Sequence, residues 1–579
     1  MMAEITGGEL LLRSLHAQHI HHIHAITDGT YMIFLEALER LGPELDMRLI
    51  VPRHEAAAAH AADAYTRVTG EPAVVMACAG PGAANLLAGI ICAQAEGSPV
   101  VAITTMRRAD VSDDYRHLGG TQSPDHQALF QPAVKWSGRV SHWRHIPDMV
   151  RHAFRVAMAG TPGPVHLLIP EDVLNQRGDE ASAPLWPRAR GQAMAPAVAH
   201  PEDVRRAAEM LVGAKFVNIH AGNGANRSGA GVEIQALAEH LGCAVTNNVT
   251  ARGILPEDHP QLFPPLCMAA FMAHQQADLI LAVGTRFGEL VMWGKPPLWG
   301  DPATQPTIQI DINPAHIGLN RPVDVPLIGD ARIVMQQLLD AVRELTPPRP
   351  PHPKLAELGM VRAQWQKGLD DAVADRERAP MLTGTIFQVC NEFFADDAIL
   401  ALDGGNTVMW GMHYHLPRRQ QSVLYTANMG YLGTGLPYAI GAKIAAPERQ
   451  VYCVTGDSAF GFNMQELETA ARLRLPIITI VAVDGAFGME KSAQRRVFGR
   501  EAEWFMHDHA PVRYDKVAEA MGCHGEYVER GVDLMPALRR STASGKPAVI
   551  HAVIDADANV DPPGMWIWNS ARSGNVSFG

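Results

Sequence analysis

The sequence predicts an α/β protein of three doubly wound parallel-sheet domains with a C-terminal lid, and three observations support this fold class. Short apolar runs that end in Gly or Asp turns alternate with helical patterns, as expected for parallel sheets covered by helices. Two stretches rich in Pro, Ala and charge interrupt this pattern, at 179–202 and 346–354. The length of 579 residues suits about three domains of ordinary size.

These breaks place the expected domain boundaries. We expect domains at 1–178, 200–345 and 360–557, followed by a tail at 558–579. The tail is apolar and aromatic without a helical period, and Trp566 and Trp568 would be costly to expose. It is therefore expected to close over another part of the protein. A tail packed permanently on its own subunit or on a partner explains the composition equally well.

Composition sets the broad class of the protein. Hydrophobic residues make up 47% of the chain and charged residues 19%, which is ordinary for a globular protein. A net charge of −12 argues against a nucleic-acid-binding surface, and no apolar run approaches the ~20 residues of a membrane span. The N-terminal segment does not resemble a signal peptide, and the seven cysteines include no C-x-x-C pair. A cytoplasmic protein without nucleic-acid or membrane partners is expected.

In the first domain, three turns carry candidate functional residues. The segment LIVPRHEAAAAHAADAYTRVTG predicts a strand, a short turn and an Ala-rich helix that begins at Glu55. The helix dipole alone favours an acid there, so Glu55 is either a helix-terminal charge or a functional acid. Gly80 and Gly82 lie in a loop where the backbone can approach a ligand. Asp28 lies in a Thr-Asp-Gly turn, a sequence that also forms ordinary turns.

In the third domain, the segment from Gly456 to Gly488 carries the strongest functional signal. A strand, a helix and a second strand are predicted in turn, and Asp457 and Asp484 follow the two strands. Open parallel sheets bind ligands at the carboxyl ends of their strands, so both carboxylates are expected at that edge. Two hard oxygen ligands beside a loop of backbone N–H groups suit Mg²⁺ that holds a diphosphate. Two ordinary α/β loops are the alternative.

The same segment resembles the diphosphate motif of thiamine diphosphate (ThDP) enzymes, which usually reads GDG…NN. Here Ser458 replaces a glycine, Val483 replaces the first asparagine and Asp484 replaces the second. Aspartate keeps an oxygen ligand, and serine is small enough to leave the turn intact. The order of the three domains resembles the pyrimidine-binding, central and diphosphate-binding domains of the ThDP decarboxylase and acetolactate synthase superfamily. This resemblance covers nearly the whole chain.

The resemblance implies ThDP and Mg²⁺ as cofactors. The implied metal ligands are Asp457, Asp484 and the main-chain carbonyl of Ala486. Glu55 matches the acid that shares a proton with the aminopyrimidine ring. Because that acid and the metal come from different subunits in this superfamily, a homodimer or homotetramer is expected. The implied cofactor-binding positions are Asp28, Gly80, Gly82, Asn406, Thr407, Leu432, Gly456, Asp457, Ser458, Ala459, Asp484, Ala486, Phe487, Gly488 and Met489.

Two of the matched residues have ordinary explanations as well. Leu432 falls where a bulky apolar residue props the cofactor, but on its own it would be a core leucine. Gln122 falls where acetolactate synthases and 2-hydroxyacyl-CoA lyases carry a glutamine that contacts substrate, and a surface-loop glutamine explains it nearly as well. The five histidines at 16, 19, 21, 22 and 24 lack the ligand spacing typical of zinc, so a metal site is not expected there.

The central domain carries a weaker signal for a nucleotide. Gly222, Arg286 and Asp311 follow apolar runs in a Rossmann-like pattern. These positions resemble those used for FAD in acetolactate synthases and for ADP in oxalyl-CoA decarboxylases. ADP is expected here in preference to FAD, although many relatives keep this fold without any nucleotide.

The reaction is indicated by a few residues after the metal loop. Glu490 falls where relatives line the substrate cavity, and an acid there would repel a substrate carboxylate but suit proton transfer to a hydroxyl. The tail resembles the lid of oxalyl-CoA decarboxylases and 2-hydroxyacyl-CoA lyases. Arg495, Arg496 and Arg572 are candidates for the phosphates of coenzyme A, with a solvated helix face as the alternative for the first two.

The sequence therefore leads to a ThDP-dependent 2-hydroxyacyl-CoA lyase as the first hypothesis. Such an enzyme cleaves its acyl-CoA substrate to an aldehyde or ketone plus formyl-CoA, and catalyses the reverse condensation. Glu55, Gln122 and Glu490 are the expected catalytic residues. The first alternative is an acetolactate-synthase-like carboligase or a 2-keto-acid decarboxylase, which shares every cofactor residue. A non-catalytic homologue is the remote alternative.

Overall fold

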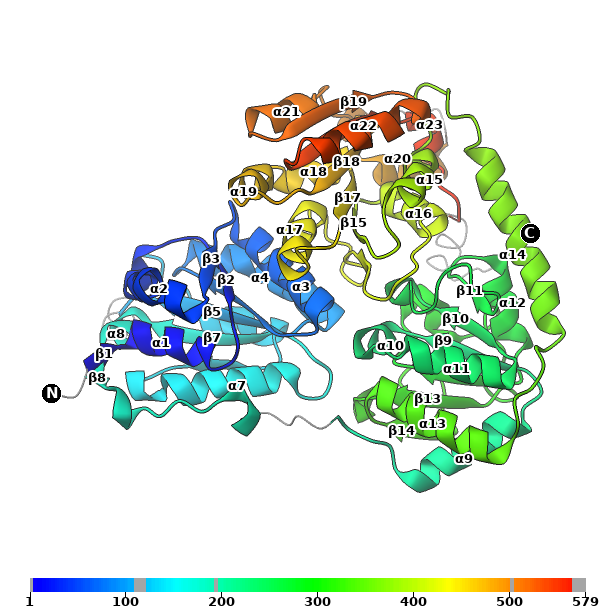
Figure 1. Cartoon of the computed structure of the whole chain (residues 1–579), viewed down its shortest axis with the longest axis horizontal. Helices are drawn as coiled ribbons and strands as arrows, with labels where there is room; N and C mark the ends of the chain where they lie inside the picture. Colours follow the sequence, from blue (N-terminus) through cyan, green and yellow to red (C-terminus); the bar gives the residue numbers. More distant parts are fainter. Residues whose placement is uncertain (1–3, 109–120, 192–195, 500–504, 565–579) are drawn as a thin grey trace.

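Three six-stranded parallel sheets, each covered by helices on both faces, make up the chain in the computed structural model (Figure 1). The structure describes residues 4–108, 121–191, 196–499 and 505–564. The N-terminal lobe lies at the left of Figure 1, the central lobe at the lower right and the C-terminal lobe at the top. The predicted fold class of three parallel α/β domains is therefore confirmed. The predicted C-terminal lid falls mostly on 565–579, outside the described residues.

The N-terminal sheet has the strand order β3-β2-β4-β5-β7-β6. Alternate residues of β4 face opposite sides, so Val74 and Met76 pack with α1, α2 and α7, whereas Val75 and Ala77 pack with α3 and α4. The strands are β2 (His22–Ala25), β3 (Arg48–Ile50), β4 (Ala73–Ala77), β5 (Val100–Met106), β6 (Ser137–Arg139) and β7 (Val165–Pro170). The helices are α1 (Gly7–His16), α2 (Met32–Leu45), α3 (Glu55–Thr69), α4 (Pro81–Glu96), α6 (His126–Phe130), α7 (Ile146–Met158) and α8 (Glu171–Asn175). A short antiparallel pair joins β1 (Glu4–Thr6) to β8 (Arg177–Asp179).

The central sheet has the strand order β11-β10-β9-β12-β13-β14. Leu279 and Leu281 of β12 pack in one core with α9, α11 and α13, whereas Ile280 and Ala282 pack in a second core with α12 and α14. The strands are β9 (Val217–Ala221), β10 (Ala244–Asn247), β11 (Leu262–Phe263), β12 (Leu279–Val283), β13 (Thr307–Asp311) and β14 (Val325–Ile328). The helices are α9 (Pro201–Gly213), α10 (Asn223–Ser228), α11 (Gly231–Leu241), α12 (Met268–Gln276), α13 (Ala331–Leu345) and α14 (Lys354–Ala372).

The C-terminal sheet has the strand order β16-β15-β17-β18-β20-β19. Its strands are β15 (Ile399–Asp403), β16 (Val423–Leu424), β17 (Val451–Gly456), β18 (Ile478–Val483), β19 (His524–Val528) and β20 (Ala548–Val553). Its helices are α15 (Thr383–Phe393), α16 (Asn406–Tyr414), α17 (Gly435–Ala445), α18 (Asp457–Asn463), α19 (Glu466–Arg472), α20 (Gly488–Phe498), α21 (Tyr514–Ala520), α22 (Gly531–Ala543) and α23 (Ala556–Asn559). Because β15, β17 and β18 are neighbours and parallel, the loops that follow them meet at one edge of the sheet.

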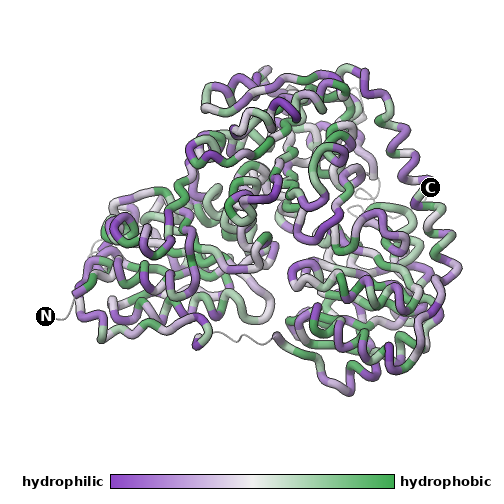
Figure 2. The backbone as a smooth tube through the Cα atoms, viewed as in Figure 1, coloured by the Kyte–Doolittle hydropathy of each residue, from purple (hydrophilic) through white to green (hydrophobic). Residues whose placement is uncertain are grey.

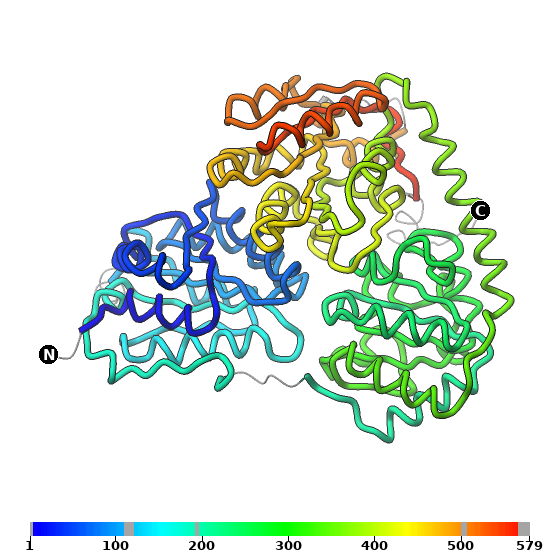
Figure 3. Tube along the Cα trace, viewed as in Figure 1, coloured from blue at the N-terminus to red at the C-terminus, as the bar shows by residue number. Residues whose placement is uncertain are grey.

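The lobes are joined by close helix contacts as well as by the chain (Figure 3). Helix α3 packs on α17, where a Cβ on Gly441 would lie 2.0 Å from the carbonyl oxygen of Ala61, so this approach requires glycine. Helix α14 runs along the right side of Figure 1 and leads from the central lobe to the C-terminal lobe. The Nη1 of Arg362 donates to the carbonyl of Leu262 at 2.7 Å, so α14 is fastened to the central lobe. The predicted boundary at residue 360 falls inside this helix.

Hydropathy follows the layers of the fold. Hydrophobic segments run through the interior of each lobe, and hydrophilic ones lie mainly around the outside (Figure 2). Among the described residues, no helix is both long enough and apolar enough to cross a membrane. All seven cysteines are free thiols, and six of them are buried.

Candidate active site

A cavity of about 430 Å³ lies at the carboxyl edge of the C-terminal sheet. Its size is typical of a site for a small molecule or cofactor. It contains every residue of the C-terminal domain that the sequence predicted to hold the cofactor, together with Glu490. These residues are Asn406, Thr407, Leu432, Gly456, Asp457, Ser458, Ala459, Asp484, Ala486, Phe487, Gly488 and Met489. The loops after β15, β17 and β18 supply most of them, as the strand order requires.

Two facing carboxylates form the polar end of this cavity. Asp457 is the first residue of α18, and its oxygens accept the main-chain N–H groups of Ser458 and Gly485, both at 2.8 Å. Burial and the nearby charge of Asp484 raise the pKa of Asp457 to about 7. Burial likewise raises the pKa of Asp484. The unfavourable pairing of two buried carboxylates would be relieved by a cation between them.

The donor set fits Mg²⁺ bound to a diphosphate. Asp457, Asp484 and the carbonyl of Ala486 offer hard oxygen ligands, and Mg²⁺ commonly takes its remaining ligands from phosphate and water. Among the described residues, no group of three or more His, Cys, Asp and Glu side chains could hold a metal by itself. No Lys, Arg or His of the described chain lines the cavity. A diphosphate would therefore depend on a divalent cation for its counter-charge.

Helix N-termini supply the other part of a diphosphate site. Helices α16 and α18 both begin at the cavity, so N–H groups without partners inside the helix are available to an anion there. The Nδ2 of Asn406 is held by the hydroxyl of Ser492 at 3.0 Å and by the carbonyl of Asn559 at 2.7 Å. Its Oδ1 is buried without a hydrogen-bond partner. This amide oxygen is an acceptor, so the partner it lacks would be a hydrogen-bond donor or a cation and not a phosphate oxygen.

Two residues of this site were missed in the sequence. Asn559 of α23 donates its Nδ2 to Asp484 Oδ2 at 2.7 Å, and so orients a predicted metal ligand. His509 Nε2 lies 2.8 Å from the hydroxyl of Ser458, which donates to the carbonyl of Ala486 at 2.7 Å. Neither residue belongs to a motif: Asn559 is the last residue of α23, and His509 lies in the segment before α21. The serine that replaces the usual glycine thus positions a second predicted metal ligand.

A second cluster lies at the carboxyl edge of the N-terminal sheet. Glu55 begins α3 and accepts a hydrogen bond from Asn85 Nδ2 at 3.0 Å. Burial and the carboxylates of Asp28 and Glu55 raise the pKa of the Cys78 thiol, because the three groups are neighbours. Asp28 also caps the following turn, where it accepts the N–H of Thr30 at 2.8 Å.

Gly80 and Gln122 complete this cluster. A Cβ on Gly80 would lie 2.8 Å from the Cα of Gln122, so the two loops are in contact. Gln122 has a left-handed backbone with φ of 60° and accepts a hydrogen bond from Arg107 at 2.9 Å. The sequence-predicted residues of the first domain are therefore brought together. No described residue of the N-terminal lobe lines the cavity of about 430 Å³, so one chain does not unite the two predicted halves of the site.

The fit around Glu55 leads to a prediction about Gly82. A Cβ on Gly82 would lie 2.6 Å from Cys78 Sγ and 3.3 Å from Glu55 Oε1. Gly82→Ala should therefore displace the Glu55 carboxylate and lower turnover about tenfold or more, because misplaced catalytic groups lose their geometry. Mg²⁺-dependent binding of thiamine pyrophosphate, measured by calorimetry, should change much less. Turnover at the wild-type rate in Gly82→Ala would show that activity does not depend on the position of the Glu55 carboxylate beside Gly82.

The central lobe borders a larger cavity of about 610 Å³, which all three lobes line. Arg286 and Asp311 line it, as the nucleotide hypothesis requires. Gly222 is not among the lining residues; its N–H donates to the carbonyl of Val283 at 2.8 Å, and it packs against Gly284. This glycine therefore serves the close approach of two loops beside the cavity.

The candidate coenzyme A residues lie elsewhere. Arg495 is paired with Asp557 at 3.0 Å, and Arg496 is exposed one residue further along α20. Neither lines the cavity that contains Glu490. Arg572 lies outside the described residues.

Comparison with known proteins agrees with this architecture. The chain matches the family models of thiamine pyrophosphate enzymes: the N-terminal TPP binding domain over residues 5–129, the central domain over 204–338 and the C-terminal TPP binding domain over 403–552. The chain belongs to the thiamine pyrophosphate enzymes.

Its relatives in this family include proteins named as acetolactate synthases. A probable acetolactate synthase large subunit of Methanocaldococcus jannaschii is 32% identical over 577 residues, covering 97% of this chain and 94% of that protein. An acetolactate synthase of Mycobacterium bovis is 31% identical over 583 residues, covering 97% and 90%. The acetolactate synthase isozyme 3 large subunit of Escherichia coli is 28% identical over 576 residues, covering 97% of both chains.

Proposed function

We propose that this protein is a Mg²⁺- and ThDP-dependent carboligase that decarboxylates a 2-keto acid such as pyruvate and joins the remaining acyl group to a second carbonyl compound. The observation that carries the proposal is the similarity to proteins named acetolactate synthase over 97% of the chain. The cavity with its carboxylate pair and two helix N-termini supports it. This changes the preference drawn from the sequence, in which the carboligase was the first alternative.

The chain's own residues divide the work of binding between them. Asp457, Asp484 and the Ala486 carbonyl would hold Mg²⁺, while N–H groups at the start of α16 and α18 would bind the diphosphate. Bound ThDP supplies a nucleophilic carbon and an electron sink for the bond that breaks. Apolar side chains line much of the remaining cavity and exclude water from the reacting groups; among them are Val249, Leu266, Leu290, Met292, Met429 and Leu432.

Glu55 is the proposed acid of this mechanism, and it would come from a second copy of the chain. Its carboxyl group would share a proton with a ring nitrogen of the cofactor, and the hydrogen bond from Asn85 would hold it in place. In one chain the Glu55 cluster and the Asp457 cavity have no lining residue in common. A homodimer in which each subunit completes the site of the other resolves this separation. Gln122, which lies with Glu55, would then face the substrate.

A specific observation favours the acyl-CoA lyase as the second candidate. Glu490 lines the same cavity as the carboxylate pair, and no cationic side chain of the described residues lies there to bind the carboxylate of a 2-keto acid. A substrate whose carboxyl group is masked as a thioester would avoid this repulsion. Glu490 would then move the proton of the substrate hydroxyl. Arg496 remains a candidate for contact with coenzyme A.

The two candidates differ in their products, so one experiment separates them. Purified protein with ThDP and Mg²⁺ is incubated with pyruvate, and separately with a panel of 2-hydroxyacyl-CoAs, and the products are followed by mass spectrometry. Loss of pyruvate with formation of acetolactate supports the carboligase. Formyl-CoA supports the lyase instead. A protein that binds ThDP and Mg²⁺ but converts neither class of substrate would overturn both, and would favour a non-catalytic homologue.

The role of Glu490 is tested by the same assay. Glu490→Gln removes the proton-carrying group and the repulsive charge but keeps the shape of the side chain. In a carboligase it should leave turnover within a few-fold or lower the KM for pyruvate, because like charges repel. In a lyase it should lower kcat by about 10²-fold or more. Equal rates for wild type and variant with a 2-hydroxyacyl-CoA would remove Glu490 from the lyase mechanism.

Two further properties belong to this proposal. The cavity lined by Arg286 and Asp311 would take an adenine nucleotide, and the colour of the purified protein distinguishes FAD from ADP. The seven free cysteines support a cytoplasmic location, where thiols stay reduced.

A further inference from the structure

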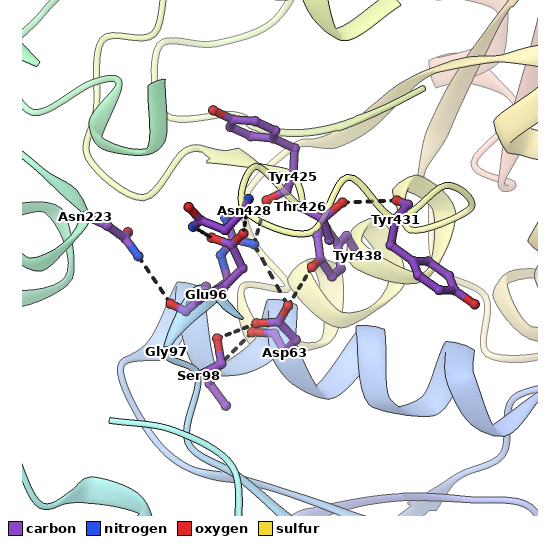
Figure 4. A network of polar contacts seen from close by, with 12 residues as sticks. Asp63, Glu96, Gly97, Ser98, Asn223, Tyr425, Thr426, Asn428, Tyr431 and Tyr438 are labelled. Atoms are coloured by element: carbon purple, nitrogen blue, oxygen red, sulfur yellow. Dashed lines mark hydrogen bonds and ion pairs between the residues drawn. The ribbon is translucent and has the colours of Figure 1, made fainter. Parts of the chain in front are cut away.

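A buried polar network joins the three lobes at the point where they meet (Figure 4). Asp63 of α3 and Glu96 at the end of α4 come from the N-terminal lobe, and both are at most 2% exposed. Arg67 lies one helical turn beyond Asp63, at 4.0 Å from its carboxylate. Arg227 of α10 reaches in from the central lobe and donates to the hydroxyl of Ser98 at 3.1 Å. Tyr438 of α17 donates to Asp63 at 2.5 Å from the C-terminal lobe.

Within this network, the carboxylate of Glu96 accepts two hydrogen bonds from one residue of the C-terminal lobe. The main-chain N–H of Asn428 donates to Glu96 Oε1 at 2.9 Å, and its Nδ2 donates to Oε2 at 3.2 Å. Both oxygens of the carboxylate are thus used by one residue. Burial raises the pKa of Glu96, and Arg67, the N–H of Asn428 and Arg227 oppose that shift. When the carboxylate is ionised, its hydrogen bonds are roughly twice as strong as neutral ones.

Asn428 belongs to a segment that forms one wall of the candidate active site. Of residues 425–432, all except Asn428 line the cavity of about 430 Å³. The segment is closed by its own bonds, from Gly430 N–H to the Thr426 carbonyl at 2.8 Å and from the Thr426 hydroxyl to the Tyr431 carbonyl at 3.0 Å. Its tip has little packing support, since Met429 is 45% exposed. The position of the tip therefore depends on bonds from outside the segment.

Tyr425 and Ala427 pack with the C-terminal core, the Tyr431 ring lies 5.2 Å from that of His60, and two polar contacts from the N-terminal lobe add to this support. Arg67 donates to the carbonyl of Tyr425 at 3.0 Å and fixes the start of the segment, while Glu96 fixes its tip. Both residues belong to the N-terminal lobe. The segment also carries Leu432, the residue predicted to prop the cofactor. A displacement of the N-terminal lobe would thus be transmitted to the wall of the cofactor cavity.

We propose that Glu96 is a positioning residue of the active site: through Asn428 it holds the segment 425–432 in the conformation that accepts the cofactor. The proposal rests on the proposed function insofar as the cavity binds ThDP. It extends that function by assigning a role to a buried acid that touches neither cofactor nor substrate. The length of the side chain, and not only its charge, is then essential.

Three variants separate the effect of the length of the Glu96 side chain from the effect of its negative charge. Glu96→Asp keeps the negative charge beside Arg67 and Arg227 but withdraws the carboxylate by one methylene. Glu96→Gln keeps the length of the side chain, but its amide N–H₂ group would face one of the two N–H donors of Asn428. Asn428→Ala changes an exposed residue, leaves the charge network intact and removes one of the two bonds. Glu71→Gln is the matched control, because it alters an exposed carboxylate of the same lobe that pairs with Arg188.

Two measurements are made on the full-length protein. Hydrogen exchange of amides 426–432 is followed without cofactor, and the Kd for ThDP is measured by calorimetry with Mg²⁺. We expect faster exchange in all three variants and a Kd raised about tenfold in Glu96→Asp and Glu96→Gln, with a smaller rise in Asn428→Ala and none in Glu71→Gln. A double variant Glu96→Asp/Asn428→Ala should bind ThDP no more weakly than Glu96→Asp alone, because both changes break the same contact.

The outcomes that would overturn the proposal are distinct from those that concern the function. If wild-type protein binds ThDP and Glu96→Asp matches it in both measurements, Glu96 only balances charge and the proposal is wrong. If Glu96→Gln fails to fold, Glu96→Asp and Asn428→Ala still decide. If wild-type protein does not bind ThDP, the proposed function fails, whereas the exchange measurement still shows whether Glu96 positions the segment.

Discussion

Glu55→Gln lowers turnover by about 10²- to 10⁴-fold with every substrate, while ThDP and Mg²⁺ still bind. The substitution keeps the shape of the side chain and its contact with Asn85, but it removes the only group of that position that can exchange a proton. No described residue of the N-terminal lobe lines the cavity that we propose for the diphosphate, so the affinity for the cofactor should change little. Steady-state kinetics and calorimetry on the same preparation measure the two effects. Turnover near the wild-type rate would remove Glu55 from the mechanism. It would also contradict the proposal that the Glu55 cluster and the Asp457 cavity form one active site.

Asp457→Asn weakens Mg²⁺-dependent binding of ThDP by roughly 10²-fold or more. Both carboxylate oxygens of Asp457 accept main-chain N–H groups, so the N–H₂ of an asparagine would face a donor, and the charge that binds the cation would be lost. Asp484→Asn makes the same chemical change at the position where the usual ThDP motif carries asparagine. It should cause a much smaller loss.

Calorimetric titration of ThDP into each variant, with and without Mg²⁺, measures this difference. Thermal unfolding of both proteins controls for stability, because Asp457 and Asp484 are both largely buried carboxylates. Equal losses of affinity in Asp457→Asn and Asp484→Asn would contradict the assignment of Asp457 as the main metal ligand.

The order of apolar strands in the sequence was enough to predict the fold and the edge of the sheet at which the cavity of about 430 Å³ lies. Strands β15 and β17 are largely apolar runs that end in Asp403 and Gly456, and β18 is an apolar run followed by Asp484. Parallel neighbours of this kind bring their following loops together. For the same reason, Asp457 and Asp484 could be placed at one edge of the sheet, because each follows a predicted strand. The resemblance predicts that Glu55 lies apart from that edge in a single chain, and no described residue of the N-terminal lobe lines the cavity there.

What the sequence could not predict depends on contacts between distant segments. Asn559 lies beyond the last strand in a tail without periodicity, yet it reaches Asp484. The bonds between Glu96 and Asn428 join residues far apart in the chain and depend on how whole lobes pack. Helix α14 follows a Pro-rich linker and lacks a clear amphipathic pattern, so its start was missed. The choice between carboligase and lyase depends on how a cavity is lined, which periodicity does not reveal.

The most direct test of the account is activity regained by mixing two inactive subunits. Glu55→Gln and Asp457→Asn chains are produced together with different affinity tags, and the hybrid that carries both tags is purified. If each site joins Glu55 of one subunit to the Asp457 cavity of the other, a hybrid dimer contains one intact site and should recover about half the wild-type rate on the substrate found active, while each parent stays nearly inactive. A hybrid as inactive as its parents would contradict a site shared between subunits, and with it the proposed arrangement of the enzyme.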